Sequence, residues 1–249
     1  MNHNLVEQSY WDDNYEKCND IIVAREDSPI RQWLTRFFNN AQGTCFEVGC
    51  FPGTYLSIFG ELGYELYGID LTPRVETDLP LWLKNRGYKV GKFFQADFLK
   101  YNDENKYDIV SSFGFIEHFI NWDDILIKQA RLVKEGGYLV VQIPNFRGFI
   151  QRTLHIFLDK ENYNLHNISS MNPDLWANII RKMDFEIVYY GYFGAFHFWI
   201  GKQSRNIIQK ASIALIRHLL PFLKKIPKDR MVYSPYCGLI AKKGRELKL

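Results

Sequence analysis

The sequence predicts an α/β protein built on a doubly wound, mostly parallel sheet. Short apolar segments alternate with amphipathic ones through the first 144 residues, a pattern typical of strand–helix–strand units with right-handed crossovers. A glycine-containing turn from Gly49 to Gly53 follows the first apolar segment and leads into a helical one. The chain has 249 residues and no internal repeat or low-complexity tract, so we expect a single domain.

Two helices are expected before the first strand, over residues 8–19 and 28–40. Ser28 suits the N-cap of the second helix and Pro29 its first turn, and apolar residues then recur on one face. The core follows from residue 44. Its strands are expected at 44–48, 65–70, 89–95, 107–112 and 137–143, and its helices at 54–62, 74–85 and 122–134.

The last of these helices carries boundary signals at both ends. Asn121 and Asp124 are placed to cap its start, and Gly136 and Gly137 to end it. Beyond Pro144 the alternation loosens. We expect helices at 146–158, 173–183 and 206–224, a polar loop at 161–170, and strands at 185–192 and 233–241.

The final expected strand contains Pro235 and Gly238, which indicates a less regular edge position. Two long additions, at 146–171 and 193–230, are expected above the end of the sheet that holds the active site. We therefore divide the domain into N-terminal helices (1–43), a core of alternating strands and helices (44–144), and a final part with the two additions and the last two strands (145–249).

Composition excludes several classes of protein. A hydrophobic share of 47% with 24% charged residues is ordinary for a globular chain and argues against disorder. A net charge of +3 is too mild to indicate nucleic-acid binding. Basic residues do cluster late, from Lys202 to Arg245. They form either a solvated face or a site for an anionic acceptor.

The four cysteines have no metal-binding spacing and no Cys-x-x-Cys pair, so we expect reduced thiols in a cytoplasmic protein. The N-terminus lacks a basic-then-apolar leader, and no apolar run is long enough to cross a bilayer. We expect a soluble or peripheral protein without stable membrane insertion.

The most informative stretch is FEVGCFPG at 46–53, together with the aspartate that closes the next strand. Asp70 lies about 20 residues beyond the glycines, where a carboxylate binds a ribose diol. Glu47 would repel a pyrophosphate but suits an ammonium or sulfonium group. Both carboxylates fit a cofactor that is cationic at one end and adenosine-like at the other. S-adenosyl-L-methionine is such a molecule.

From residues 46 to 70 the chain resembles the class I S-adenosylmethionine-dependent methyltransferases. The resemblance extends with good motif agreement from about 44 to 143, and more loosely to 241. The resemblance implies a Rossmann-like, seven-stranded sheet whose last two strands form an antiparallel hairpin. One position departs from the pattern, because Phe51 stands where the family often has glycine. The cofactor contacts implied in this region are made by Glu47, Gly49, Cys50, Gly53, Asp70 and Leu71.

The resemblance implies four further cofactor contacts. Asp97 would bind the adenine amino group, Phe98 would pack on the ring, and Ser112 would lie at the exit of the fourth strand. Tyr10 belongs to an aromatic helix, with Trp11, that would cover the methionine end. The alternative for Asp97 is a solvated turn residue, and we favour the adenine contact because the position matches the family in strand order as well as residue type. The aromatic helix is equally explained as packing.

The exit of the fourth strand reads SSFG, whereas methyltransferases acting on nucleobase nitrogens carry Asn/Asp-Pro-Pro-aromatic there. The Glu117–His118 pair that follows is frequent in small-molecule O-methyltransferases of the family, including those of ubiquinone biosynthesis. An imidazole with a pKa of about 6.5 is suited to take the proton of a hydroxyl acceptor. His166 is a candidate to share this role with Glu117. The alternative is that both histidines are structural. No ligand spacing indicates a metal.

The expected reaction is O-methylation of a small molecule, a sugar, or a nucleotide-linked or phosphorylated acceptor such as a capsule or polysaccharide precursor. The acceptor pocket is expected between the two additions, with Arg147, Arg152 or Arg230 facing an anionic group. Two alternatives stay open. One is a peripheral enzyme for a lipid or quinone that uses 206–224 as a membrane-surface helix. The other is a non-catalytic binding protein, for which Phe51 is the hint.

Overall fold

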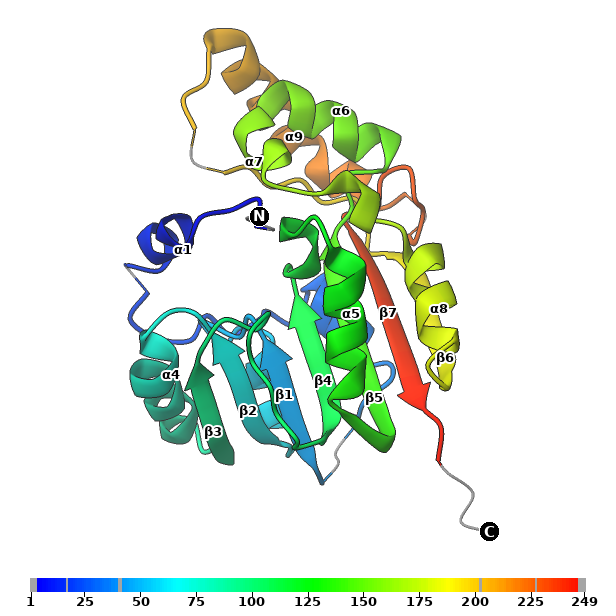
Figure 1. The fold of residues 1–249 in the computed structure, drawn as a ribbon. Helices are drawn as coiled ribbons and strands as arrows, with labels where there is room; N and C mark the ends of the chain where they lie inside the picture. The colour runs from blue at the N-terminus through cyan, green and yellow to red at the C-terminus, as the bar shows by residue number, and fades with distance from the viewer. Residues whose placement is uncertain (1–3, 17, 40–41, 202, 227, 246–249) are drawn as a thin grey trace.

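The computed structural model describes residues 4–16, 18–39, 42–201, 203–226 and 228–245. Seven strands form one sheet in the order β3-β2-β1-β4-β5-β7-β6 (Figure 1). The first five strands are mutually parallel, and β7 runs antiparallel to both of its neighbours. The strands are β1 (Thr44–Val48), β2 (Glu65–Asp70), β3 (Val90–Gln95), β4 (Tyr107–Phe113), β5 (Val133–Pro144), β6 (Phe185–Phe193) and β7 (Tyr236–Lys243).

Helices cover both faces of the sheet. Apolar side chains of α2, α3 and α4 pack on one face, and those of α5 and α8 on the other, where they lie in front of the sheet in Figure 1. The helices are α1 (Gln8–Tyr15), α2 (Pro29–Leu34), α3 (Leu56–Glu61), α4 (Arg74–Asn85), α5 (Trp122–Arg131), α6 (Phe149–Leu158), α7 (Lys160–Asn164), α8 (Pro173–Arg181) and α9 (Ile207–Leu223), with 3-10 turns η1 (Ile116–His118) and η2 (Ile168–Ser170).

The central strands are buried on both faces of the sheet, because apolar side chains point from them to either side. In β1, Phe46 and Val48 join the core under α5 and α8, whereas Cys45 joins the core under α2, α3 and α4. Successive side chains of a strand point to opposite faces, so a strand covered by helices on both sides is apolar throughout. The doubly wound sheet and the antiparallel last pair are confirmed.

The expected end of α5 was wrong. The helix stops at Arg131, and β5 already begins at Val133, so Gly136 and Gly137 lie inside the strand. The register against β4 shifts between Tyr107 and Ile109. Gly136 takes a φ of +74°, a conformation that glycine adopts readily at a bulge. At the other end Asn121 occupies the N-cap position without a side-chain capping bond.

The edge assignment of the last strand was also wrong. β7 lies between β5 and β6, and Pro235 falls just before it. Glycine is required at position 238 for another reason, because a Cβ there would come within 2.8 Å of the Trp33 ring. The glycine lets helix α2 approach the sheet closely.

Three expected segments have other boundaries. The loop predicted at 161–170 contains α7 and η2, and Asn167 caps η2 by accepting a hydrogen bond from the Ser169 backbone N–H. The helices predicted at 8–19 and 28–40 end at Tyr15 and Leu34. The stretch expected to continue the second of these helices includes Asn40, which lies outside the described residues, as does Lys202 of the basic cluster.

The two additions stand above the carboxyl ends of the strands, as expected (Figure 1). A buried ion pair fastens them together, with Arg205 Nη2 3.0 Å from Asp159 Oδ1. Gln209 at the start of α9 also donates a hydrogen bond to the carbonyl of Phe157 in α6. Helices α6, α7 and α9 therefore form a layer at the same end of the sheet as the glycine turn.

Candidate functional site

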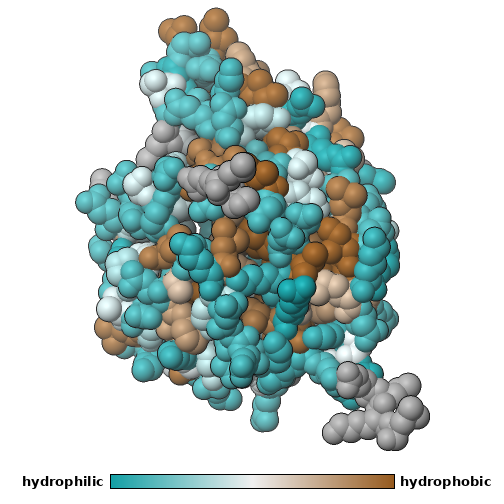
Figure 2. Space-filling view, in the orientation of Figure 1, coloured by the Kyte–Doolittle hydropathy of each residue, from teal (hydrophilic) through white to brown (hydrophobic). Residues whose placement is uncertain are grey.

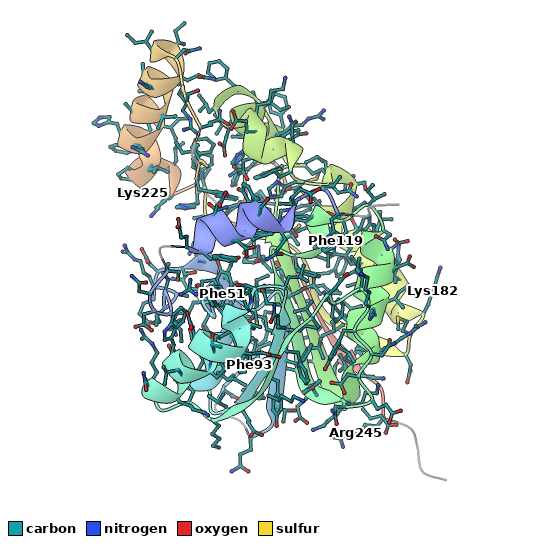
Figure 3. All side chains as sticks on the ribbon, turned by 60° about the vertical axis from the view of Figure 1, so that its left-hand side comes forward. Phe51, Phe93, Phe119, Lys182, Lys225 and Arg245 are labelled. Atoms are coloured by element: carbon teal, nitrogen blue, oxygen red, sulfur yellow. The ribbon has the colours of Figure 1, made fainter. Side chains whose placement is uncertain are left out.

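A cavity of about 370 Å³ opens at the carboxyl ends of β1, β2 and β4. This edge is where ligands bind in doubly wound sheets. Figure 3 shows helix α1 lying above it, with Phe51 and Phe119 labelled. Of the predicted site residues, those that line it are Glu47, Gly49, Cys50, Asp70, Leu71, Asp97, Phe98 and His118.

Two glycines shape the turn after β1. Gly49 has a φ of +70°, and a Cβ there would lie 2.6 Å from the Phe115 ring. Gly53 has a φ of +88° and supports the turn from behind, where a Cβ would meet Leu79 at 2.6 Å. Gly53 is not among the residues that line the cavity. Its role follows from backbone conformation and close packing rather than from ligand contact.

Two carboxylates line the cavity at the ends of β1 and β2. Asp70 accepts hydrogen bonds from the backbone N–H groups of Phe51 and Thr72, each at 3.1 Å. Burial nevertheless raises the pKa of Asp70 to about 6. Burial and the nearby Asp70 raise the pKa of Glu47 well above its usual range. The Oε2 atom of Glu47 has no hydrogen-bond partner among the described residues, so it is available to a cationic or hydrogen-bonding ligand.

The third strand ends in a turn built around an aspartate. Asp97 Oδ1 accepts a hydrogen bond from the Leu99 backbone N–H at 2.9 Å, so this residue does serve the turn. Asp97 and Phe98 both line the cavity, and the adenine contacts stay a prediction. Ser112 is fully buried, donates to Gln129 Oε1 at 3.0 Å and does not line the cavity.

The N-terminal segment covers the cavity. Trp11 and Tyr15 line it from α1, whereas Tyr10 is 38% exposed and does not line it. The segment is fastened at both ends. The backbone N–H of Leu5 donates to the carbonyl of His118, and Arg74 of α4 donates to the carbonyl of Tyr15. Helix α1 is thus held over the site by the core itself.

Phe51 packs among aromatic side chains. It is 2% exposed, and its ring centre lies 5.2 Å from that of Tyr15 and 5.6 Å from that of Trp82. The Arg74 guanidinium stands 5.1 Å above the same ring. The bulky side chain at the glycine position is thereby accommodated as part of the cavity wall.

The exit of β4 carries the candidate catalytic residues. His118 lines the cavity, and its Nδ1 bonds to the carbonyl oxygen of Leu165 at 2.9 Å. Glu117 and His166 lie directly behind it and do not line the cavity. The structure therefore brings the three predicted residues together, although only His118 is in reach of a ligand in the cavity.

Burial sets the protonation of this group. It lowers the pKa of His118 to about 4 and raises that of Glu117 to about 8. Burial and the nearby His118 lower the pKa of His166 to about 3. At neutral pH both imidazoles are therefore uncharged, and the carboxyl of Glu117 is mostly protonated.

The two additions, expected to wall the acceptor pocket, do not line this cavity, and that pocket stays a prediction. Among the residues that line the cavity, none comes from 146–171 or 193–230, and Arg147, Arg152 and Arg230 are exposed elsewhere. The N-terminal segment, from Asn4 to Tyr15, takes that place. The aromatic residues of α1 were the available sequence signal. The contribution of Asn4 and Val6 had none, because it depends on the bridge that pairs Asn4 with Phe119.

A second cavity of about 690 Å³ adjoins the first, and Thr54 and Tyr55 line both. Its wall includes part of the second addition, from Phe193 to His197. Aromatic rings, cations and two aspartates line it. These residues are Trp33, Phe193, Phe196 and Tyr236, then Arg25, Arg36, Lys224 and Lys228, with Asp27 and Asp229.

Comparison with solved structures shows the same fold. A putative methyltransferase from Bacillus halodurans superposes with a TM-score of 0.59 at 17% identity, covering 86% of this chain and 98% of its own. An S-adenosylmethionine-dependent methyltransferase from Archaeoglobus fulgidus gives 0.54 at 19%, covering 96% and 100%. An N-methyltransferase from Bradyrhizobium japonicum, solved with S-adenosyl-L-homocysteine, gives 0.56 at 12%, covering 95% and 99%.

Curated relatives are similar over part of the chain. The ubiquinone biosynthesis O-methyltransferase of Hydrogenovibrio crunogenus is 26% identical over 166 residues, which is 66% of this chain and 67% of that protein. The enzyme of the same name from Dechloromonas aromatica is 27% identical over 139 residues, covering 55% of this chain and 58% of its own length.

Fold and site together define a class I S-adenosylmethionine-dependent methyltransferase. The chain belongs to the methyltransferase-domain family, whose sequence profile matches residues 23–190. The cavity suits S-adenosylmethionine. It offers the unpartnered carboxyl oxygen of Glu47 to a cationic group, and at Asp70 a carboxylate held in place by two backbone amides. The enzymatic activity and the cofactor expected from the sequence are confirmed.

Proposed function

We propose that this enzyme methylates a hydroxyl oxygen of a small-molecule acceptor, with His118 as the group that receives the hydroxyl proton. The observation that carries the proposal is the tautomer of His118. Because its Nδ1 bonds to a carbonyl oxygen, which only accepts, Nδ1 carries the proton and Nε2 keeps a free lone pair. This imidazole lines the cofactor cavity at the exit of β4. Curated relatives named as O-methyltransferases support the same chemistry.

The cofactor would be held by the carboxylates at the strand ends. Asp70 suits the ribose hydroxyls, Asp97 and Phe98 suit the adenine, and Glu47 suits the cationic methionine end. When bound, S-adenosylmethionine supplies an activated methyl group on sulfur. The protein then has to exclude water and align the acceptor oxygen, which the cover formed by Trp11 and Tyr15 favours.

His118 would act late in the reaction. A pKa of about 4 makes the neutral imidazole of His118 a weak base. It therefore takes the proton only as methylation makes the acceptor oxygen less basic and its proton more acidic. Glu117 Oε1 lies 3.8 Å from Nε2 of His118, and in its ionised form it would stabilise the resulting imidazolium. His166, behind them, would hold the pair in place.

The second cavity supports an anionic acceptor. It adjoins the cofactor cavity at Thr54 and Tyr55 and offers four cationic side chains against two aspartates. Its aromatic rings suit a ring-containing or apolar group. Phosphorylated or nucleotide-linked sugars and capsule precursors are acceptors of this kind, since they combine a ring with a negative charge. The exposed basic residues of the second addition would also attract the negative charge of such an acceptor.

An acceptor screen tests the proposal. Purified enzyme is incubated with S-adenosylmethionine and matched pairs of acceptors that carry either a hydroxyl or an amine on the same skeleton, with and without a phosphate. We expect S-adenosylhomocysteine to form with hydroxyl acceptors and the product to carry an O-methyl group by mass spectrometry. Methylation of amines alone would contradict the proposal. Cofactor binding without turnover on any of these acceptors would also contradict it.

A lipid or quinone acceptor is the second candidate. Several apolar side chains of α6 and α9 are strongly exposed, among them Phe149 (74%), Ile207 (82%) and Phe222 (64%). Figure 2 shows brown, apolar residues at the upper end of the molecule, where these helices lie. Arg217 and Lys225 flank them, and an apolar face with cations suits a membrane surface. Within the described part of the chain, no helix combines the length and apolar character needed to span a bilayer.

A further inference from the structure

Glu117, His118 and His166 form a compact buried cluster beside the cofactor cavity. One nitrogen or oxygen atom from each side chain lies within 4.8 Å of the other two. The two imidazole ring centres are 4.8 Å apart. Two imidazoles and one carboxylate are the ligand set that zinc and other first-row transition metals accept. No spacing in the sequence indicates this cluster, because His166 comes from the first addition.

Both imidazoles are oriented as in metal sites. Nδ1 of His118 donates to the carbonyl of Leu165 at 2.9 Å, and Nδ1 of His166 donates to the carbonyl of Asn162 at 2.7 Å. Each Nε2 is then unprotonated and free to bind a cation. Metal-binding histidines usually bond their other nitrogen to a carbonyl or carboxylate, which fixes the tautomer and the ring orientation.

The carboxyl group lacks the partners that burial requires. Glu117 is 1% exposed, and its Oε2 has no hydrogen-bond partner among the described residues. An unpaired buried carboxyl is costly, and a cation would satisfy it. The surrounding backbone is firmly held. Asn167 donates its backbone N–H to the carbonyl of Glu117 at 2.7 Å and its side-chain amide to the carbonyl of Phe119 at 2.9 Å.

We propose that Glu117, His118 and His166 bind one divalent first-row transition-metal cation, with Zn²⁺ as the expected species. Bonds of about 2.0–2.2 Å require the ligand atoms to approach one another to roughly 3.5 Å, a movement of about 1 Å by side-chain rotation. His166 is only half-buried, so an ion can reach the cluster from solvent on that side. Three protein ligands leave positions open, and His118 directs one side of the site to the cavity.

The inference deepens the proposed O-methylation, on which its functional meaning rests. A cation at this place would lower the pKa of an acceptor hydroxyl that reached it. A metal ion and a proton compete for the one lone pair on Nε2 of His118. The imidazole therefore receives the hydroxyl proton in the metal-free enzyme, whereas in the metal-bound form the proton leaves to water.

Metal binding is measured directly on the full chain after removal of metal with a chelator. Calorimetry with Zn²⁺, and absorption spectroscopy with Co²⁺, compare the wild type with His166→Ala, His166→Asn and Glu117→Gln. His218→Ala is the matched control, because it removes an exposed imidazole on α9. Mg²⁺ serves as a cation that imidazoles bind poorly. S-adenosylhomocysteine binding reports that each variant is folded.

We expect one Zn²⁺ per chain, unchanged in His218→Ala and weakened about 10²-fold or more in Glu117→Gln and in each His166 variant that binds S-adenosylhomocysteine normally. No stoichiometric Zn²⁺ binding, or equal affinity in those variants and the wild type, would overturn the inference. Methyl transfer to a hydroxyl by metal-free enzyme that binds no Zn²⁺ would leave the proposed function standing and remove the metal. Zn²⁺ binding without hydroxyl methylation would leave the metal site standing and contradict the proposed function.

Discussion

The cofactor core, residues 44–144, and the layer of helices α6, α7 and α9 differ in what holds them together. The core strands are covered on both faces, and its carboxylates stand at strand ends where the backbone orients them, as the two amides on Asp70 illustrate. The layer exposes apolar side chains such as Ile207 and touches the site through a few bonds, among them Leu165 to His118. The sheet thus fixes the geometry of the cofactor cavity, whereas the proposed acceptor chemistry would depend on the added layer.

The sharpest test of this division is His118, which belongs to the core but contacts the layer. In the metal-free enzyme, His118→Gln should lower turnover by about 10²–10⁴-fold, because a general base contributes in the transition state. The affinity for S-adenosylhomocysteine, measured by calorimetry, should stay the same. His218→Gln on α9 is the control and should keep full activity. A His118→Gln enzyme with wild-type turnover would show that this histidine is structural.

Glu117 should make stability depend on pH. Its pKa in the folded protein is about 8, above the usual 4.5, so between these values unfolding releases a proton and becomes more favourable as the pH rises. In the metal-free protein, prepared with a chelator, the free energy of unfolding should fall by about 1.4 kcal/mol per pH unit from pH 5 towards 8 in the wild type relative to Glu117→Gln. His118 and His166, which face Glu117, are already neutral there.

Urea unfolding at pH 5, 6, 7 and 8 measures this difference. Glu135→Gln replaces an exposed glutamate and should follow the wild type at every pH. Parallel curves for the wild type and Glu117→Gln would contradict the buried, protonated carboxyl and would place Glu117 nearer to solvent than its burial indicates.

Asp70 tests the cofactor side alone. Asp70→Ala should weaken S-adenosylhomocysteine binding by roughly tenfold or more, because a hydrogen bond to a charged group is worth about 1.5–3 kcal/mol. Asp124→Ala removes an exposed aspartate of α5 and should leave the affinity unchanged. Calorimetry measures both. Unchanged affinity in Asp70→Ala would refute the ribose contact.

The smallest expected effect concerns the outer face of the layer. If the acceptor is a lipid or quinone, the double substitution Ile207→Ser and Phe222→Ser should reduce co-sedimentation with anionic vesicles roughly tenfold, because two exposed apolar side chains are lost. Leu81→Ser, on the exposed side of α4, is the control. Equal co-sedimentation of the wild type, the double variant and the control would argue against membrane contact by α9 and favour its role as a helix that covers the sheet.

The core and the position of its carboxylates were predictable from the amino-acid sequence alone. Strand–helix alternation is a local property, and β1, β2 and α4 have the predicted bounds. Parallel strands bring their carboxyl ends to one edge, so the order of strands along the chain was enough to place Glu47, Asp70 and Asp97 together. Glycine at 49 was informative because only a residue without a Cβ fits beside Phe115.

The surroundings of these groups, in contrast, depend on how the whole chain packs. The cover by residues 4–15, the placement of β7 inside the sheet and the approach of His166 to His118 depend on contacts between segments far apart in the chain. No local pattern encodes such contacts, since they arise from the packing of whole elements. Burial then set the pKa values of Glu117 and His118, because desolvation is a property of the folded environment and not of the residue.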